Sequence, residues 1–421
     1  MAYCTECGIE LDEDSIFCSI CGTKTYLDGF KRLLPDAIDE REIITYYFKQ
    51  DLLKYDQIII TLRIYHGIEM SVRTLKRRLK SYGLSRQFSN ISIPALSAIL
   101  LREMEGPGQS KGYRSMRDHL KRSYGIRVKT DHVMRLMREL DPQGVLIRRN
   151  RRLNRRAYSS PGANHCWHVD GYDKLKPYGL AIHGCIDGFS RKIMWLNVVE
   201  SNNNPVIIAA KYLEIVQEFK FCPTIMRTDL GTENGIMADV HCFFVQNENA
   251  HFYGTSVANQ RIENWWSFLK RSFTGWIINF FKELVNEGLL ILGHHVHMKC
   301  VWFVFSNFLQ NQLDEVKHEW NSHYIRKSRH DTVSGIPNVL FHVPESVGFE
   351  DRKKIITNDM LTNLLDERDI LHEAAIAVDE NHDVELDEYF RYVVEAEHIS
   401  FPPKNWTEAR ATFLQIVNKC V

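Results

Sequence analysis

Three acidic residues lie in local contexts that could together do chemistry. Asp170 lies in WHVDGYD, which precedes the long apolar run GLAIHGCIDGFSRKIMWLNVV. Asp229 closes the strand-like segment FCPTIMRTD, and Glu263 lies in NQRIENWWSFLKRSF, whose apolar residues recur at helical spacing. Carboxylates carried by two strand ends and one helix can converge on one point, where Mg²⁺ or Mn²⁺ finds the oxygen ligands it prefers. The three acids therefore predict a two-metal site for phosphoryl transfer.

The composition indicates a sizeable core and an uneven distribution of charge along the chain. The chain has 421 residues, of which 44% are hydrophobic, and this length is typical of about two to four domains. Lys plus Arg and Asp plus Glu number 53 each, so the formal net charge is zero. However, the segment 148–156 carries six arginines and no acid, whereas the chain after Glu350 is rich in acids. This asymmetry predicts a half that faces nucleic acid and an acidic tail.

Hydropathy and most of the cysteines point to an intracellular protein. No apolar run reaches the roughly 18 residues of a membrane span, and the N-terminus MAYCTECGIE lacks the apolar core of a signal peptide. We therefore expect a soluble chain with no membrane partner. Six of the ten cysteines are scattered without pairing spacing: Cys166, Cys185, Cys222, Cys242, Cys300 and Cys420. In a reducing compartment they are best interpreted as small buried hydrophobes.

The other four cysteines are clustered at the start of the chain. They form two Cys-x-x-Cys pairs that are separated by ten residues, Cys4 with Cys7 and Cys18 with Cys21. Four thiolates at this spacing predict a closed tetrahedral site for structural Zn²⁺, the alternatives being a disulfide pair or chance spacing. So short a segment has too little core to fold unaided, so the metal would supply most of the folding free energy. Residues 1–26 resemble zinc ribbons, which serve as DNA-binding or protein-docking modules.

Residues 36–142 have the pattern of two tandem helix-turn-helix units. In the first, a helical pattern from Asp39 breaks at Gly67, and Ser71 is a good N-cap for the next helix, VRTLKRRLKSYG. That helix carries basic residues and almost no acid: Arg73, Lys76, Arg77, Arg78 and Lys80. We expect it to contact DNA. An ordinary solvated face of an amphipathic helix has the same composition.

The second unit repeats this arrangement. ISIPALSAILLREMEG is followed by a glycine-rich break at 106–112, by YRSMRDHLKRSYG, and by TDHVMRLMREL with Thr130 as the expected N-cap. Its last helix carries Arg135 and Arg138. Two such units would allow the chain to contact two successive patches of a duplex.

An arginine-rich linker is expected at residues 143–160. It contains Arg148, Arg149, Arg151, Arg152, Arg155 and Arg156. A cluster this dense is costly to bury, so we expect it to be exposed or paired with DNA phosphates. A nuclear-import signal has the same composition, and the two interpretations are compatible. The expected location is the nucleus.

Positions 164–266 resemble the catalytic core of the retroviral integrase and DDE transposase superfamily, and more closely the integrase-core proteins that animal genomes carry as relics of mobile elements. The match runs from HVDGYD through CIDGFSRKIMWL and TDLGTENG to QRIENWW. The resemblance implies an α/β, RNase H-like core over residues 161–345, with a mixed five-stranded sheet flanked by helices. It places the catalytic acids at Asp170, Asp229 and Glu263, although the step from Asp229 to Glu263 is slightly shorter than in retroviral integrases.

The same resemblance sets the expected roles of neighbouring residues. Asp187 is expected to lie in the second strand and to have a structural role. Asp173 and Glu233 are expected at the surface or behind the metal ligands.

The helix of Glu263 offers further groups to a substrate. Lys270 and Arg271 follow Glu263 by roughly two helical turns and could hold substrate phosphates. Trp265 and Trp266 are more typical of core packing than of base stacking.

Two segments beyond the core are open to more than one interpretation. His294, His295 and His297 lack the spacing of a metal motif and predict a helix start or loop. A long helix follows, which would pack on the core or mediate self-association. The acidic C-terminal region, residues 346–421, predicts one or two helices, and an acidic tail could compete with DNA for the basic half of the chain.

The sequence thus predicts a DNA-binding polynucleotidyl transferase of the integrase type, dependent on Mg²⁺ or Mn²⁺. DNA and further copies of the chain are the expected partners, and no small-molecule substrate is expected. One alternative is a non-catalytic protein that retains the integrase fold and binds nucleic acid. A nuclease without strand transfer would use the same three carboxylates with a different nucleophile.

Overall fold

The structure is a computed structural model of the chain. It describes residues 2–3, 10–11, 39–49, 53–84, 86, 88–142, 159–254, 259–327, 333–367, 369–381 and 383–420. The chain divides into two compact units, Met1–Ser85 and Arg86–Val421. No helix in the described ranges is long and apolar enough to cross a membrane.

The first unit contains a short hairpin and three helices. Its elements are β1 (Ala2–Tyr3), β2 (Glu10–Leu11), α1 (Glu40–Lys49), α2 (Tyr55–His66) and α3 (Val72–Ser81). Gly67 ends α2 in the left-handed conformation, with φ of 63°. The Ser71 hydroxyl accepts a hydrogen bond of 3.2 Å from the backbone N–H of Thr74 and so caps α3. The predicted helix, glycine turn and capped basic helix are therefore present.

The second unit begins with another group of helices. They are α4 (Ile93–Met104), the 3₁₀ turn η1 (Pro107–Ser110), α5 (Tyr113–Ser123) and α6 (Thr130–Leu140). Buried side chains from α4, α5 and α6, among them Leu100, Met116 and Val133, form a small core of their own. The prediction that Thr130 caps α6 is wrong, because Lys129 occupies the N-cap position. The Thr130 hydroxyl instead accepts a hydrogen bond of 2.9 Å from Arg117.

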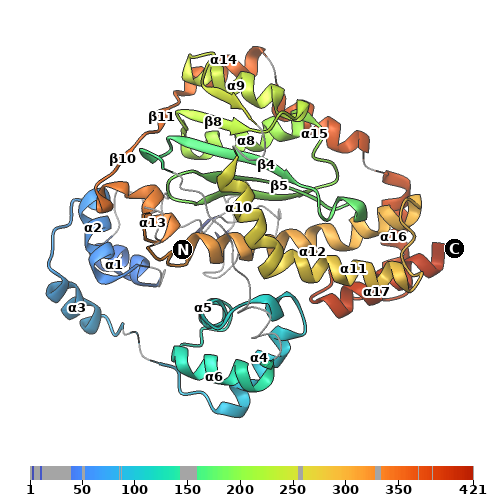
Figure 1. Cartoon of the computed structure of the whole chain (residues 1–421), viewed down its shortest axis with the longest axis horizontal. Helices are drawn as coiled ribbons and strands as arrows, with labels where there is room; N and C mark the ends of the chain where they lie inside the picture. Colours follow the sequence, from blue (N-terminus) through green and yellow to red (C-terminus); the bar gives the residue numbers. More distant parts are fainter. Residues whose placement is uncertain are drawn as a thin grey trace. The chain divides into compact units, whose positions relative to one another are not determined.

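A mixed five-stranded sheet lies at the centre of the second unit, in the order β6-β5-β4-β8-β9. The strands are β4 (Cys166–Tyr172), β5 (Ala181–Asp187), β6 (Ile193–Val199), β8 (Ile225–Thr228) and β9 (His251–Tyr253). β6, β5 and β4 pair antiparallel, whereas β4, β8 and β9 run parallel. Figure 1 shows this sheet with helices on both sides. The predicted fold class is confirmed.

Shorter elements complete the second unit. They are β3 (Gly162–Ala163), η2 (Lys176–Tyr178), α8 (Pro205–Phe219), β7 (Phe221–Cys222), η3 (Thr232–Asn234), α9 (Gly235–Val245), α10 (Gln260–Leu269), the π-helical turn η4 (Lys270–Thr274), α11 (Gly275–Asn286), α12 (His295–Ser322), α13 (Pro337–His342), η5 (Pro344–Val347), β10 (Glu350–Asp351) and β11 (Lys354–Ile355). α12 is the predicted long helix, and it packs along β6.

The strands separate two apolar layers, because successive side chains of a strand point to opposite faces. Trp167 and Val169 of β4 pack with α8 and α9 on one face. Tyr172 of β4 packs with α10, α11 and α12 on the other. By this alternation, Asp170 lies on the same face of β4 as Tyr172 and therefore on the side of α10.

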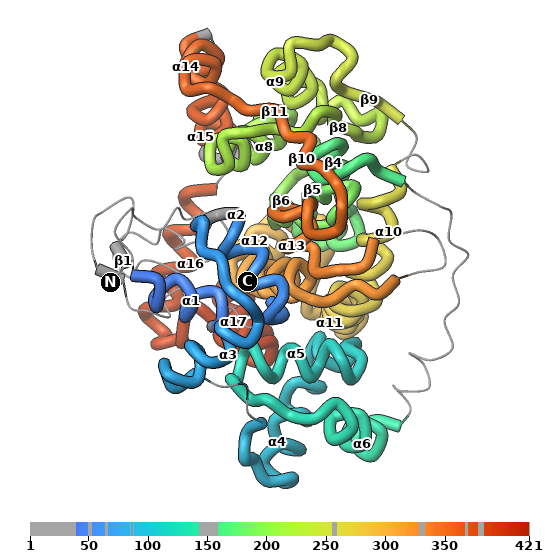
Figure 2. The backbone as a smooth tube through the Cα atoms, turned by 90° about the vertical axis from the view of Figure 1, so that its left-hand side faces the viewer, coloured from blue at the N-terminus to red at the C-terminus, as the bar shows by residue number. Residues whose placement is uncertain are grey.

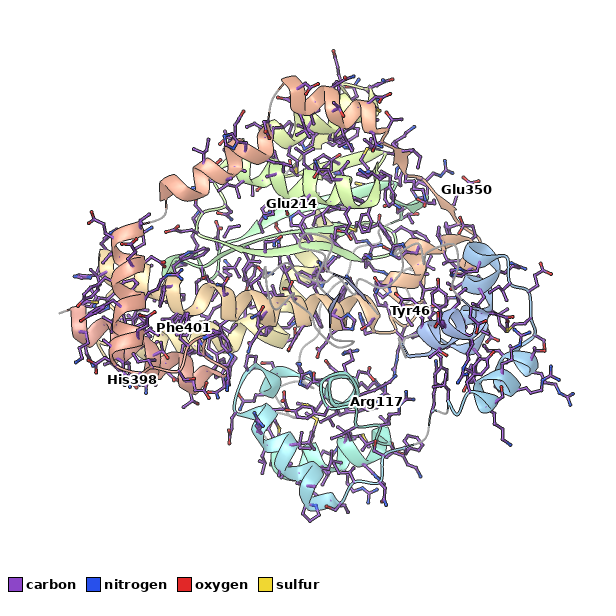
Figure 3. The ribbon with its side chains drawn as sticks, turned by 180° about the vertical axis from the view of Figure 1, so that it is seen from behind. Tyr46, Arg117, Glu214, Glu350, His398 and Phe401 are labelled. Atoms are coloured by element: carbon purple, nitrogen blue, oxygen red, sulfur yellow. The ribbon has the colours of Figure 1, made fainter. Side chains whose placement is uncertain are left out.

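The C-terminal region is folded against the core. It contains four helices, α14 (Asn358–Glu367), α15 (Ile370–Asn381), α16 (Val384–Ala396) and α17 (Trp406–Cys420). α15 packs on α8, and α16 and α17 pack on α12, as the tube in Figure 2 allows the reader to follow. Phe401, labelled in Figure 3, stacks on Phe303 of α12 with ring centroids 4.9 Å apart. The prediction of one or two helices is thus wrong, because apolar residues of this acidic segment complete the core.

Candidate active site

Asp170 lies on β4, and Asp229 directly follows the neighbouring strand β8. β4 and β8 pair in parallel from Cys166 and Ile225 to His168 and Arg227, a constant offset of 59 residues. The same offset relates Asp170 to Asp229, which directly follows β8. Adjacent strands lie about 4.8 Å apart, so the two carboxylates leave neighbouring backbones on the same face.

Glu263 lies in the first turn of α10, whose start is fastened to β4 by Asn259. The Asn259 side chain is buried and donates a hydrogen bond of 2.8 Å to the carbonyl of Val169. Its Oδ1 lies 2.8 Å from Nδ1 of His168 and accepts a hydrogen bond from it. The backbone N–H of Glu263 in turn bonds to the carbonyl of Asn259 at 3.3 Å. Asn259 therefore positions the helix that carries Glu263.

Neither Asn259 nor His168 was singled out by the sequence reasoning. The available signal was an asparagine four residues before Glu263, at the start of a helical pattern. Burial lowers the pKa of His168 to about 3, so its imidazole is neutral at physiological pH. A neutral imidazole that donates from Nδ1 carries its single proton there.

The three carboxylates influence one another electrostatically. The pKa of Asp170 is raised to about 7, first by burial and then by the negative charges of Glu263 and Asp229. The pKa of Glu263 is also raised, first by burial and then by the charge of Asp229. Two acids whose ionised forms are disfavoured by neighbouring negative charge suit a site that a divalent cation would stabilise.

Trp266 donates a hydrogen bond from its indole Nε1 to Oδ2 of Asp170, at 2.9 Å. Gly184 of β5 lies directly opposite Asp170 in the strand pairing. A Cβ at Gly184 would lie 2.8 Å from the Trp266 ring, so the glycine makes room for the indole. Trp265 and Trp266 are both buried, as expected of core residues, but the bond to Asp170 was not predicted.

Asp229 is held by the turn that follows it. Its Oδ1 accepts hydrogen bonds from the backbone of Gly231 at 3.3 Å and from Nδ2 of Asn234 at 3.2 Å. Oδ1 of Asn234 is buried and has no hydrogen-bond partner among the residues that the structure describes. An unsatisfied buried oxygen beside Asp229 suits a cation or one of its water ligands.

These donors fit Mg²⁺ or Mn²⁺ in chemistry. Asp170, Asp229 and Glu263 supply carboxylate oxygens, the hard ligands that both ions take. Within the described ranges, however, no three His, Cys, Asp or Glu side chains lie close enough together to hold one ion. Trp266 and Asn234 each donate a hydrogen bond to a carboxylate oxygen of this site, Trp266 to Asp170 and Asn234 to Asp229.

Comparison with known families agrees with this geometry. Residues 157–343 match the family described as "Integrase core domain". The second unit therefore contains an integrase core. Residues 3–25 match a zinc-ribbon domain, which includes all four clustered cysteines. No curated protein matches the chain.

Asp187 has the structural role in the integrase core that its position in the second strand predicts. It is fully buried and accepts hydrogen bonds from the backbone N–H of Asn164 at 2.9 Å and of Ser190 at 2.7 Å. The Ser190 hydroxyl also donates to it, at 2.7 Å. These bonds close the turn between β5 and β6. Asp173 lies at the surface, where it accepts a hydrogen bond of 2.7 Å from Asn202.

Lys270 and Arg271 lie where α10 passes into η4. Lys270 is exposed and lies two helical turns beyond Glu263, on the same side of the helix. Arg271 is half-buried, and its Nε donates a hydrogen bond of 2.8 Å to the carbonyl of Ser267.

The remaining predicted nucleic-acid and metal residues are placed as follows. On α3, Arg73, Lys76, Arg77 and Lys80 are exposed, whereas Arg78 pairs with Glu40. His294 precedes α12 and His295 begins it, as the prediction of a helix start requires. The zinc cysteines Cys4, Cys7, Cys18 and Cys21 and the arginines Arg148, Arg149, Arg151, Arg152, Arg155 and Arg156 lie outside the described residues.

The six scattered cysteines are all free thiols. Cys166, Cys185, Cys222 and Cys300 are buried, as expected of small hydrophobes, whereas Cys242 and Cys420 are half-buried.

Proposed function

We propose that this protein is a DNA-binding polynucleotidyl transferase that cleaves and joins DNA strands with the help of Mg²⁺ or Mn²⁺. The proposal is carried by one observation. Asp170 lies on β4 and Asp229 directly follows the adjacent parallel strand β8, and the charge of Asp229 raises the pKa of both Asp170 and Glu263. In an integrase core, this arrangement of carboxylates suits a metal-dependent reaction on DNA.

The bound cations and the protein side chains would have separate roles in the reaction. Divalent cations, when bound, would activate a water or a DNA 3′ hydroxyl and stabilise the leaving oxygen. Asp170, Asp229 and Glu263 would hold those cations, while Asn259 keeps Glu263 over the strands. Lys270 would neutralise a phosphate of the strand under attack, since it projects from the same side of the helix as Glu263.

The remaining parts of the chain would bind and orient DNA. The exposed basic residues of α3 suit a duplex backbone or groove, and the arginine run 148–156 suits phosphates. The zinc ribbon would add a further docking or DNA-binding module, with Zn²⁺ held by its four cysteines. The arginine run 148–156 would also suit nuclear import, so the proposed location is the nucleus, and joining two DNA ends would require more than one copy of the chain.

A second function is favoured by the contact between Trp266 and Asp170. A carboxylate whose oxygen is already hydrogen-bonded can remain in a protein that binds DNA through an integrase core without catalysing. Under this alternative the raised pKa of Asp170 would keep the acid partly protonated and lower the repulsion within the triad.

The test is a product analysis with the full-length protein, Mg²⁺, a supercoiled plasmid and short labelled duplex ends. Joined products support the transferase. Cut plasmid without joined ends supports a nuclease that uses the same site. A mobility shift with intact DNA, in both Mg²⁺ and Mn²⁺, supports the non-catalytic binding protein.

A further inference from the structure

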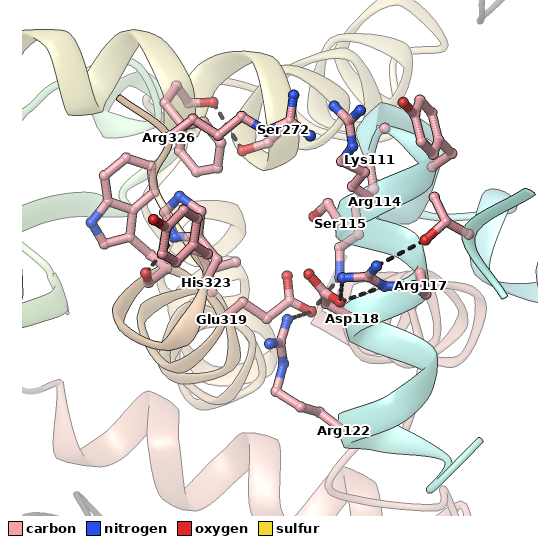
Figure 4. A pocket seen from close by; sticks show the side chains of 17 residues that line it. Lys111, Arg114, Ser115, Arg117, Asp118, Arg122, Ser272, Glu319, His323 and Arg326 are labelled. Carbon is pink, nitrogen blue, oxygen red and sulfur yellow. Dashed lines mark hydrogen bonds and ion pairs between the residues drawn. The ribbon is translucent and has the colours of Figure 1, made fainter. Parts of the chain in front are cut away.

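A cavity of about 600 Å³ lies within the second unit, between α5 and the integrase core. One wall comes from α5 and the residues just before it. The other comes from η4, the end of α12 and the segment that follows α12. Figure 4 shows Arg114 and Arg117 on the α5 side, with Ser272, His323 and Arg326 across the cavity from them.

The two walls are fixed to each other by buried polar contacts. Glu319 of α12 accepts a hydrogen bond of 2.9 Å from Lys111 and lies 2.7 Å from Nδ1 of His119. Arg122 donates a further bond of 3.2 Å to Ser322. These contacts hold α5 against α12, so the two walls of the cavity have a defined position relative to each other.

The lining carries an excess of positive charge. Its cations are Lys111, Arg114, Arg117, Arg122 and Arg326, and its acids are Asp118 and Glu319. Both acids already have basic partners, Arg117 for Asp118 and Lys111 for Glu319. Arg114 and Arg326 are exposed, and neither pairs with an acid in the part of the chain that the structure describes. Two guanidinium groups on opposite walls are therefore available to an anion.

Aromatic rings lie between these cations. Phe268 and Trp320 pack together with ring centroids 4.7 Å apart and line the cavity beside Tyr113 and Tyr324. The Tyr324 side chain is 46% exposed, although so large a ring is usually more buried when it serves the core. A ring that remains accessible beside arginines can stack on a planar group.

We propose that this cavity binds a single strand of nucleic acid. Arg114 and Arg326 contact phosphates, and the ring of Tyr324 stacks on an unpaired base. Basic groups that track a backbone, interleaved with aromatic rings, are the chemistry by which proteins hold single strands. A duplex fits less well, because its base faces are already stacked on one another.

The cavity is distinct from the carboxylate site. Phe268 and Ser272 lie five and nine residues beyond Glu263, and about half a helical turn around from it. Binding there requires no metal and no turnover, so the inference goes beyond the proposed catalytic function and does not depend on it.

The test measures fluorescence anisotropy of a short labelled oligothymidylate with the full-length protein in EDTA. Arg114→Ala and Arg326→Ala should each weaken binding about 5-fold near 0.1 M salt and reduce the salt slope by about 0.7. Tyr324→Leu should weaken binding at least about 5-fold, whereas Tyr324→Phe should bind like the wild type. Arg410→Ala is the control, since Arg410 is a half-buried arginine on α17 that pairs with Glu287 and does not line the cavity.

Further binding measurements distinguish a single strand from a duplex, from a free nucleotide and from an acidic polypeptide. The wild type should prefer the strand to a duplex of the same length, and neither free thymidine monophosphate nor polyglutamate should displace it at equal concentration. Unchanged affinity in both arginine variants would overturn the proposal, as would displacement by either competitor. Asp170→Asn should bind the strand normally, so a failed cleavage assay leaves this result intact.

Discussion

The indole of Trp266 donates a hydrogen bond of 2.9 Å to the carboxylate of Asp170, across the interface between α10 and the sheet. One residue thus links the helix of Glu263 to the strand of Asp170. Its ring fits because β5 has Gly184 at the position facing Asp170. The packing of Trp266 therefore helps to set the distance between the carboxylate of Glu263 on α10 and that of Asp170 on β4.

Trp266→Phe should raise the pKa of Asp170 above its value of about 7. The indole hydrogen bond favours the ionised carboxylate, so its loss leaves burial and the two neighbouring charges to act alone. The measurement is an NMR titration of the carboxyl carbons in metal-free protein. Trp276→Phe, which changes an indole away from the triad, is the control and should leave that titration unchanged. A lower pKa in Trp266→Phe would contradict this account of the bond.

Gly184→Ala should destabilise the integrase core by about 1–3 kcal/mol, as overpacking of a close-packed site usually does. The new methyl group would lie 2.8 Å from the Trp266 ring, in a strand that cannot easily shift. Urea denaturation measures the free energy of unfolding. Gly235→Ala is the matched control, because nothing lies within 4 Å of its Cβ position and its φ is −60°. Equal stability of the two variants would show that the indole has room to move.

Asn259→Ala should lower any metal-dependent activity more than it lowers stability. The change removes the two bonds of the Asn259 side chain to β4, one to the carbonyl of Val169 and one from Nδ1 of His168, which costs about 1–3 kcal/mol. Activity and urea denaturation measured on the same preparation separate the two effects. The control is Asn249→Ala, at an exposed loop position. Full activity in Asn259→Ala would show that Glu263 needs no such tether.

His119 should make the docking of α5 on α12 dependent on pH. Burial disfavours its charged form, but hydrogen bonds with Glu103 and Glu319 outweigh burial and raise its pKa to about 9. Lys111 also faces this group and opposes the shift. The stabilisation is therefore complete below pH 6.5 and is lost as the pH rises through about 9.

This dependence is measured by urea denaturation between pH 6 and 10. The slope that His119 contributes between pH 7 and 9 should reach at most about 1.4 kcal/mol per pH unit in the wild type, and the slope over this range should be smaller in His119→Gln. His132→Gln, on α6 and exposed, is the matched control. A slope that persists in His119→Gln would assign the dependence to another group.

The sequence predicted the elements that carry the triad because local pattern determines them. Asp170, Asp229 and Glu263 each adjoin a segment with clear strand or helix periodicity, and the strand directions follow from the resemblance to integrases. Asp187 was also predicted correctly, because the resemblance to integrases implies a structural role for it in the second strand. These features depend on residues close together in the chain.

What the sequence did not predict depends on contacts between distant segments. Periodicity showed that Trp266 is buried but could not show that its N–H meets Asp170, 96 residues away. The same holds for Asn259 and Val169, which are 90 residues apart. The acidic composition after Glu350 also concealed apolar residues such as Phe413, which are recognisable as core only beside α12.

The folded C-terminal region changes the interpretation of one experiment. If the acidic segment competes with DNA for the basic half of the chain, removal of residues 350–421 should tighten DNA binding. It would also remove Phe390, Trp406 and Phe413 from the core, so loss of the fold would obscure any electrostatic effect. Charge-neutralising variants of exposed acids on α16, such as Glu388→Gln and Glu395→Gln, test the competition without that cost.

The most direct test of the central claim compares triad variants in the Mg²⁺-dependent cleavage and joining assay. Asp170→Asn, Asp229→Asn and Glu263→Gln keep side-chain shape but remove the charge that would hold metal, so each should abolish product while the protein stays folded. Asp173→Asn, a surface acid one turn from the site, should retain activity. Products from Glu263→Gln at the wild-type rate, with the wild type active, would contradict the assignment of these carboxylates.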